Sequence, residues 1–223
     1  MQTSPSPDER SGNSDGERAF EWIRPERFTN WPQSKSHLHS IWNCGAPEEL
    51  LRLLGQRLAE QLDDLIDLDA LVMNLDRFIT ASRSPTSLLS LFERDETALS
   101  ALLRVFMTSQ TLANRLIADP ESFDLMRASD GQGTERKFLV DEMVAELQPL
   151  DSPNRAAIAI RKFVSRETVR IAYGEFIRQL NADVVGKQLT YVADAVLEAS
   201  LVFVLRRLAK RDRIPVRIDG HQV

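Results

Sequence analysis

Hydrophobic residues recur every three or four positions over most of the chain after residue 46, which is the spacing of one face of an α-helix. Ala46-Pro47-Glu48-Glu49 opens the first such segment, because proline and acidic side chains favour the first turn of a helix. Asp67, Ser84-Pro85 and Asp95 open the next three helices in the same way. The first segment shows the spacing most clearly, with Leu50, Leu51, Leu54, Leu58 and Leu62.

The same pattern continues through the second half of the chain. Ser109 can cap a short helix, and Asp119-Pro120 ends that helix and begins another. The glycine pair in 130–134 predicts a loop that tolerates insertions. A helix follows over 138–147, and then a long one from Asn154 to about Leu180, preceded by the cap and proline of 151–153. The last helix, from about Gly186 to Lys210, is apolar on two faces, which predicts burial within a bundle.

Strand signals are nearly absent from the chain. Only Ile214 to Ile218 alternates, and Pro215 confines this segment to an edge or terminal strand. The pattern therefore predicts an all-α fold, an irregular multi-helix bundle with one helical domain over 46–212. We expect 213–223 to be an extended end and a truncation point of a longer protein.

The first 45 residues differ in composition from the rest. Residues 1 to about 18 are rich in serine, proline, glycine and acids, and predict a disordered tail because they contain too little to bury. Trp22, Trp31 and Trp42 follow without helical or strand periodicity. This spacing favours an extended aromatic arm that docks on the helical body, or that binds a partner instead.

The composition of the chain argues against several classes of protein. A chain of 223 residues with 43% hydrophobic and 27% charged residues can bury a sizeable core. Its formal net charge of -5 argues against nucleic-acid binding. The single cysteine, Cys44, excludes an intramolecular disulfide and a Cys-based zinc framework, and fits a reducing cytoplasm. No apolar run approaches the length that a membrane-spanning helix needs, so we expect no membrane partner.

One basic cluster is a candidate interface. Lys162, Arg166 and Arg170 follow at successive i+4 steps on the long helix, so they line one face. Such a ridge can contact a phosphate-bearing ligand or the acidic rim of a catalytic domain. The alternative is a solvated face, in which Glu167 pairs with its arginine neighbours.

No residue pattern forms a self-sufficient active site. The acids Asp63, Asp64, Asp67 and Asp69 surround a helix end, where they are more often caps and solvated groups than metal ligands. Two-metal phosphoryl transfer needs carboxylates held rigidly, typically on a strand, and Asp67-x-Asp69 lies between helices. His37 and His39 have no acid near them in sequence. We therefore assign no catalytic residue, metal ligand or cofactor to this chain.

Several short segments together carry a family resemblance. Arg161 to Ile171 and Tyr191 to Glu198 in the last two helices are joined upstream by Asn74-Leu75-Asp76-Arg77-Phe78, Ser109-Gln110 and Asp119-Pro120. Over roughly Leu65 to Leu208, the chain resembles the helical region that precedes the first nucleotidyltransferase domain of glutamine synthetase adenylyltransferases.

The resemblance implies a function for the intact family. Its members transfer AMP between ATP and glutamine synthetase with magnesium, under regulation by glutamine and the PII signal protein in nitrogen metabolism. This chain lacks the glycine-pair strand and the Asp-x-Asp motif of that chemistry. We expect a non-catalytic helical section that supports a downstream nucleotidyltransferase domain or contacts glutamine synthetase. The alternative is an independent helical adaptor that uses the aromatic arm to bind another protein.

Overall fold

The computed structural model describes residues 23–61, 67–212, 217–218 and 221–222. The chain divides into two compact units, Met1–Phe123 and Asp124–Val223, where the sequence predicted a single helical domain over 46–212. The all-α prediction is confirmed, since the described chain is helical except for its turns and a pair of two-residue strands. The predicted disordered tail and Trp22 lie outside the described residues.

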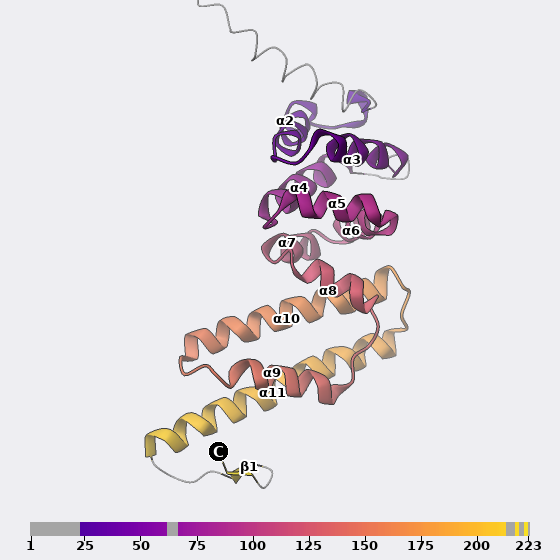
Figure 1. Ribbon diagram of the computed structural model, residues 1–223. Helices are drawn as coiled ribbons and strands as arrows, with labels where there is room; N and C mark the ends of the chain where they lie inside the picture. Colours follow the sequence, from indigo (N-terminus) through magenta and orange to yellow (C-terminus); the bar gives the residue numbers. More distant parts are fainter. Residues whose placement is uncertain (1–22, 62–66, 213–216, 219–220, 223) are drawn as a thin grey trace, which may run out of the picture. The chain divides into compact units, whose positions relative to one another are not determined.

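Unit 1 is a stack of short helices (Figure 1). Prolines, acids and serines end one helix and begin the next. Asp67 caps its helix as predicted, and Ser84 and Asp95 also cap theirs, each by accepting a backbone N–H. The elements are the 3-10 helix η1 (Pro25–Arg27), α2 (Trp31–Trp42), α3 (Glu48–Gln61), α4 (Leu68–Ala81), α5 (Pro85–Arg94), α6 (Glu96–Thr108), α7 (Gln110–Ala118) and the start of α8 (Ser122–Ser129).

Helix α4 lies at the centre of unit 1 and packs against α2, α6 and α7. Its apolar face is fully buried, and Phe78 contacts Phe106 and Phe123 edge to face, with ring centroids 5.9 and 5.7 Å apart. Phe92 of α5 reaches the same Phe123 ring at 6.5 Å. These aromatic contacts add to the apolar area that the helices bury, and they join α4, α5, α6 and α8 in one core.

The prediction of an extended aromatic arm is wrong for the part of it that the structure describes. Residues 31–42 form helix α2, because Asn30 caps the helix by accepting from the Gln33 N–H and proline is tolerated in the first turn. Leu38 and Ile41 bury the inner face of this helix against unit 1. Trp31 is half-buried and its ring lies 5.3 Å from that of Phe28, so it packs rather than projects.

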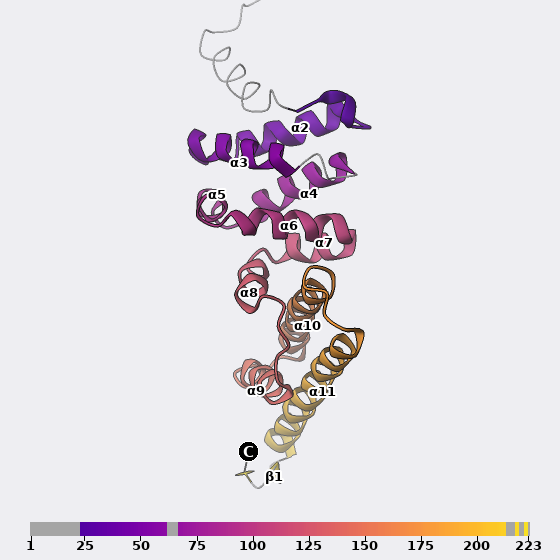
Figure 2. The same cartoon turned by 90° about the vertical axis from the view of Figure 1, so that its right-hand side faces the viewer.

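Unit 2 is built from three longer helices (Figure 2). They are α9 (Arg136–Leu147), α10 (Pro153–Phe176) and α11 (Ala182–Asp212), followed by β1 (Arg217–Ile218) and β2 (His221–Gln222), which pair antiparallel. α11 packs most extensively on α9, and α10 contacts both. The core between them includes Leu139, Met143 and Phe163 and a line of small or apolar α11 residues, Val185, Val192, Ala195, Ala199 and Phe203.

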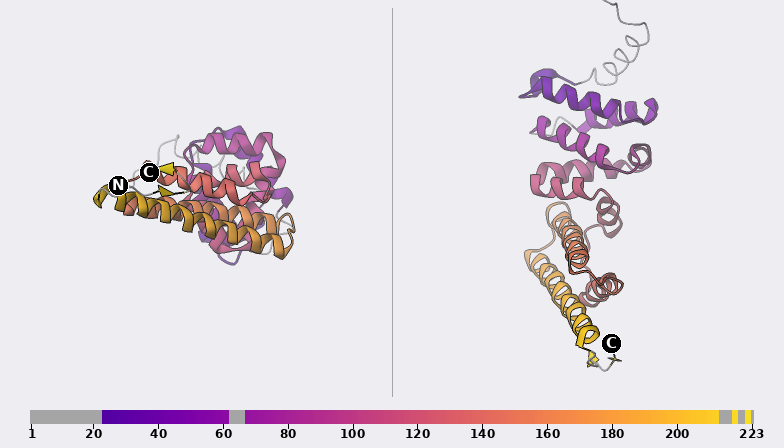
Figure 3. Two further views of the ribbon diagram at one scale, coloured as in Figure 1. Left: turned by 90° about the horizontal axis from the view of Figure 1, so that it is seen from below. Right: turned by 90° about the vertical axis from the view of Figure 1, so that its left-hand side faces the viewer.

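The prediction that α11 is buried on two faces is wrong. Val192 and Phe203 are buried, but Leu197, Leu201 and Val204 are about half or more exposed. Only one side of α11 meets α9 and α10, and Figure 3 shows this long helix at one side of unit 2. Gly186 lies inside the helix instead of before it.

Helix α11 also corrects the expectation about membrane-spanning length. Among the described residues, Ala182–Arg211 is long and apolar enough to cross a bilayer by length and composition alone, with 28% of its most apolar window buried in the protein. A single helix of this kind is weak support for a membrane span, because helices in the cores of soluble proteins have the same composition.

Candidate functional site

The three residues of the predicted basic ridge have different environments on α10. Lys162 is exposed, Arg166 is partly covered, and Arg170 is buried with 3% of its surface accessible. All three residues lie on one face of α10, as their i+4 spacing predicted, but the C-terminal end of this face contacts α11 and the loop before α9. The hypothesis of an anion-binding or partner-binding ridge therefore stays a prediction, and the buried Arg170 has almost no accessible surface to contribute to it.

Arg170 is the centre of a buried polar network. Its Nε donates to Glu167 Oε2 at 2.8 Å, its Nη1 donates to the Gln132 carbonyl at 2.5 Å, and its Nη2 donates to Gln188 Oε1 at 2.9 Å. Gln188 in turn holds both backbone groups of Thr134, by accepting from the N–H at 2.9 Å and donating to the carbonyl at 3.0 Å. One arginine thus ties α10, α11 and the loop before α9 together.

Glu167 lies between two arginines, as the alternative to a free ridge predicted. Besides its bond from Arg170, it is 3.4 Å from Arg166 Nε. The Nη2 of Arg166 also donates to Glu142 of α9 at 2.6 Å, and its guanidinium lies 5.3 Å from the centre of the Phe163 ring. Buried charges need such partners, because an unpaired ion in the protein interior is strongly destabilising. These charges join helices, and Lys162 is the ridge member with an exposed side chain.

The loop over 130–134 is fixed in place. Gly131 has a φ of +69°, and a Cβ there would lie 2.7 Å from the backbone of Gly174 on α10. Asp130 accepts two hydrogen bonds from Arg178, one of them at 2.7 Å, and this bonding raises the pKa of the arginine. The expected loop is present, but these contacts contradict the tolerance to insertions that the sequence suggested.

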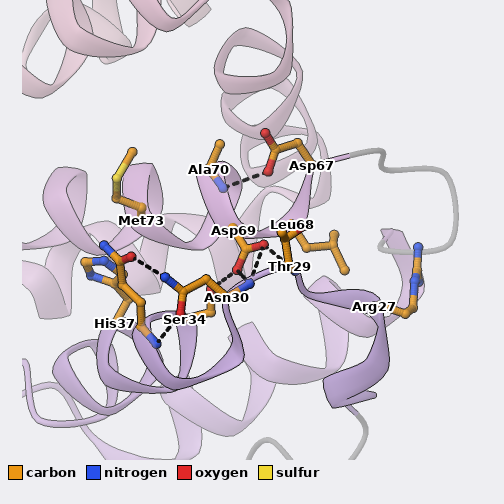
Figure 4. Close-up of a pocket in the computed structure, with 11 residues that line it drawn as sticks. Arg27, Thr29, Asn30, Ser34, His37, Asp67, Leu68, Asp69, Ala70 and Met73 are labelled. Carbon is orange, nitrogen blue, oxygen red and sulfur yellow. Dashed lines mark hydrogen bonds between the residues drawn. The ribbon is translucent and has the colours of Figure 1, made fainter.

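A cavity of about 640 Å³ lies in unit 1 between α2 and the start of α4 (Figure 4). The Asp69 carboxylate is on its wall and accepts from the Thr29 N–H at 2.7 Å, from the Asn30 N–H at 3.3 Å and from the Ser34 hydroxyl. Burial by itself raises the pKa of Asp69, but these hydrogen bonds outweigh it and leave the pKa below its ordinary value. The remaining lining residues are Arg27, Gln33, His37, Asp67, Leu68, Ala70 and Met73.

His37 has an acidic partner that the sequence did not indicate. Its Nδ1 lies 2.7 Å from Oδ2 of Asp76, which is 39 residues further along the chain, and its Nε2 is buried without a hydrogen-bond partner. The Asp76 carboxylate is well placed to fix the orientation of the imidazole ring. No local signal could have found this pair, because only the packing of α2 on α4 brings the two residues together.

Two of the upstream segments that carry the family resemblance, 74–78 and 109–110, meet in the structure. Asn74 and Gln110 exchange two amide hydrogen bonds of 3.1 and 2.9 Å between α4 and α7, and Arg77 donates to Asn114 at 2.9 Å. With the Asp76–His37 pair, this part of α4 contacts α2 on one side and α7 on the other. The polar residues of the motif therefore hold helices together within unit 1.

Within the described ranges, no group of three or more histidine, cysteine, aspartate or glutamate side chains is placed to hold a metal ion. Asp67 caps α4 by accepting from the Ala70 N–H at 3.0 Å, as predicted, and Asp69 anchors the start of α2. Asp63 and Asp64 lie outside the described residues.

The fold and these contacts place the chain in the class of all-α proteins. The polar clusters around Arg170, Asp76 and Asn74 each join neighbouring helices. A model of the family described as "Glutamate-ammonia ligase adenylyltransferase" matches residues 99–222, more than half of the chain and all of α9, α10 and α11. The chain belongs to this family, which confirms the resemblance that the sequence motifs indicated.

Two curated relatives share most of the chain. Both are named "Bifunctional glutamine synthetase adenylyltransferase/adenylyl-removing enzyme". The chain is 26% identical to the Corynebacterium diphtheriae protein over 192 residues and 28% identical to the Mycolicibacterium smegmatis protein over 195 residues. These alignments cover 82% and 84% of this chain but only 17% and 19% of the relatives. No solved structure gave a significant match.

Proposed function

We propose that this chain is a helical section of a glutamine synthetase adenylyltransferase, without AMP transfer of its own, that supports a nucleotidyltransferase domain acting on glutamine synthetase. The family match over 99–222 carries this proposal. The names of both relatives supply the reaction and the protein substrate. In this proposal, the catalytic domain uses ATP and magnesium. The protein works in the cytoplasm, and the PII protein regulates it as part of nitrogen metabolism.

The contacts of unit 2 support a scaffold role. The Arg170 network fixes the loop before α9 to α10 and α11, and a second set of ion pairs joins Arg136 of α9 to Asp194 and Glu198 of α11. A section that is rigid through its own contacts can hold a neighbouring domain in a defined orientation, which lowers the entropic cost of assembling a reactive complex. Lys162 is the exposed cation of the ridge and the candidate contact to that domain.

A transfer assay tests this proposal. The chain alone, and the chain joined to a nucleotidyltransferase domain of the Mycolicibacterium smegmatis relative, are incubated with glutamine synthetase, labelled ATP and magnesium. We expect label on glutamine synthetase only with the joined protein. Lys162→Glu should reduce the transfer rate of the joined protein, and Lys137→Glu, at an exposed lysine of α9, serves as the matched control. Transfer by the chain alone would refute the proposal.

An independent helical adaptor is the second candidate function. The observation that favours it is the exposed apolar side of α11, because soluble monomers rarely expose a large contiguous apolar surface. The aromatic arm no longer supports it, since Trp31 and Trp42 are half-buried. An adaptor would bind a protein other than glutamine synthetase with unchanged affinity after Lys162→Glu.

A further inference from the structure

We propose that the exposed face of α11 is a self-association surface, on which two copies of this chain pair through antiparallel α11 helices. This inference does not depend on the proposed function. The face, here called the α11 stripe, follows one side of the helix for almost its whole length. Its members are Gly186, Leu189, Ala193, Leu197, Leu201, Val204 and Leu208.

The α11 stripe is apolar, continuous and open to solvent. Its four leucines and its valine are between 47% and 69% exposed, and Gly186 and Ala193 are exposed as well. From Gly186 to Leu208 it is about 33 Å long at a rise of about 1.5 Å per residue. Steps of three and four residues keep its members on one side, which is the pattern by which one helix packs against another. The α11 stripe thus has the form of half of a helix pair.

The order of residue sizes along the α11 stripe favours an antiparallel partner of the same sequence. The small residues Gly186 and Ala193 lie in its N-terminal half, and the larger Leu201 and Leu208 lie in its C-terminal half. When two copies run antiparallel about Leu197, Leu201 lies opposite Ala193 and Leu208 lies opposite Gly186. At these two positions a large side chain meets a small one, which favours close packing, and Leu189 and Val204 lie opposite Leu205 and Thr190. A parallel pair would set leucine against leucine and leave a gap at the small residues.

Charges at the two ends of the same face favour the same arrangement. Asp183 and Arg211 are exposed, lie at equal distances in sequence from Leu197, and have opposite signs. An antiparallel pair brings the Asp183 end of one copy level with the Arg211 end of the other, whereas a parallel pair would place like charges together. The helix dipoles also oppose each other in the antiparallel arrangement, which is the favourable orientation.

Analytical ultracentrifugation of the 223-residue chain tests the pairing. We expect a monomer–dimer equilibrium, and Leu197→Glu should raise the dissociation constant at least tenfold, because two carboxylates would meet at the centre of the pair. Ile158→Glu is the matched control, since Ile158 is an exposed apolar residue of α10 outside the α11 stripe. Both variants should keep the far-ultraviolet circular dichroism of the native chain.

A charge complementation experiment makes the test specific. Leu197→Glu and Leu197→Lys should each be monomeric, and an equimolar mixture should form a heterodimer. Asp183→Arg should weaken the pair, and combining it with Arg211→Asp should restore it, as only the antiparallel orientation predicts. A folded chain that stays monomeric at all concentrations would overturn the proposal, and so would a dimer that Leu197→Glu leaves intact. A monomer that instead binds a different protein through the α11 stripe would also overturn it.

Discussion

At the scale of single residues, two cations on the same face of α10 differ in burial: Lys162 is exposed and Arg170 is buried. Lys162 and Arg170 lie eight positions apart on a helical face that the sequence predicted to be basic along its length. Arg170 is buried because it faces Gln188 of α11 and the Gln132 carbonyl, both distant in sequence. Its guanidinium is suited to this position, because it can direct several donors to separate acceptors at once.

Arg170→Met should destabilise unit 2 by about 3 to 5 kcal/mol, because it leaves Glu167 buried without its main partner and removes three hydrogen bonds. Lys162→Met, at an exposed position on the same helix, should change the free energy of unfolding by no more than about 0.5 kcal/mol. Urea unfolding followed by circular dichroism measures both. Equal effects of the two substitutions would contradict the network described here.

Gly131 and Gly186 provide a second contrast between residues of one type. Gly131→Ala should cost about 3 kcal/mol or more, because its φ of +69° disfavours a side chain and the new Cβ would lie 2.7 Å from the Gly174 backbone. Gly186→Ala should stabilise the chain by up to about 1 kcal/mol, since the position is helical and open. Thermal unfolding at low protein concentration compares the two. A neutral Gly131→Ala would show that the loop can move away from α10.

At the scale of elements, side chains near helix ends decide how neighbouring helices meet. Arg206 of α11 donates to the carbonyls of Leu147 and Leu150, at 3.1 and 2.6 Å, and so joins α11 to the end of α9 and the turn that follows it. Lys210 of the same helix pairs with Asp151 and lowers the pKa of that carboxyl. Asp69 has the corresponding role in unit 1, where its carboxylate on α4 accepts from the backbone that begins α2.

Asp69→Asn should reduce the stability of unit 1 by about 1 to 2 kcal/mol at neutral pH, since hydrogen bonds to a charged acceptor are lost. The pKa of Asp69 is lowered in the folded chain, so its contribution is complete above the ordinary aspartate pKa of about 3.9 and is lost as the pH falls through the folded value. The difference between native chain and variant should therefore shrink in acid. Urea midpoints measured from pH 7 down to about pH 3 follow this change.

Asp67→Asn is the control for this pH series. Asp67 caps α4 two positions before Asp69, and asparagine caps a helix about as well as aspartate. We expect little change at any pH. A constant difference between the native chain and Asp69→Asn across the series would contradict the proposed role of the Asp69 charge.

At the scale of the whole molecule, the two compact units have separate spectroscopic probes. The chain has three tryptophans, Trp22, Trp31 and Trp42, which all fall within Met1–Phe123, and two tyrosines, Tyr173 and Tyr191, which fall within Asp124–Val223. Tryptophan fluorescence therefore reports on unit 1, whereas circular dichroism reports on both units.

The two units should unfold as separate cooperative transitions, because each has its own core. Arg170→Met should shift part of the circular dichroism transition to lower urea and leave the tryptophan fluorescence midpoint unchanged. Leu75→Ala, at a fully buried residue of α4, should shift the fluorescence midpoint instead. If Arg170→Met also moved the tryptophan fluorescence midpoint, the chain would be one cooperative unit.

The sequence by itself determined the helices and the family. Caps, prolines and the three-to-four-residue spacing placed most helix starts correctly, because these signals act within one turn of the chain. They predicted the cap at Asp67 and the pairing of Glu167 with its arginine neighbours, both of which are contacts between residues close in sequence. Where local periodicity was weak, as in α2, the same signals failed.

Only the tertiary structure decided which helical faces are covered. The burial of Arg170, the His37–Asp76 pair and the close approach of Gly131 to Gly174 each join residues that are far apart in sequence. The exposure of the α11 stripe also could not be predicted, because an apolar face has the same pattern whether a neighbouring helix covers it or solvent does. Periodicity fixes which residues share a face, and the packing of distant segments fixes what that face contacts.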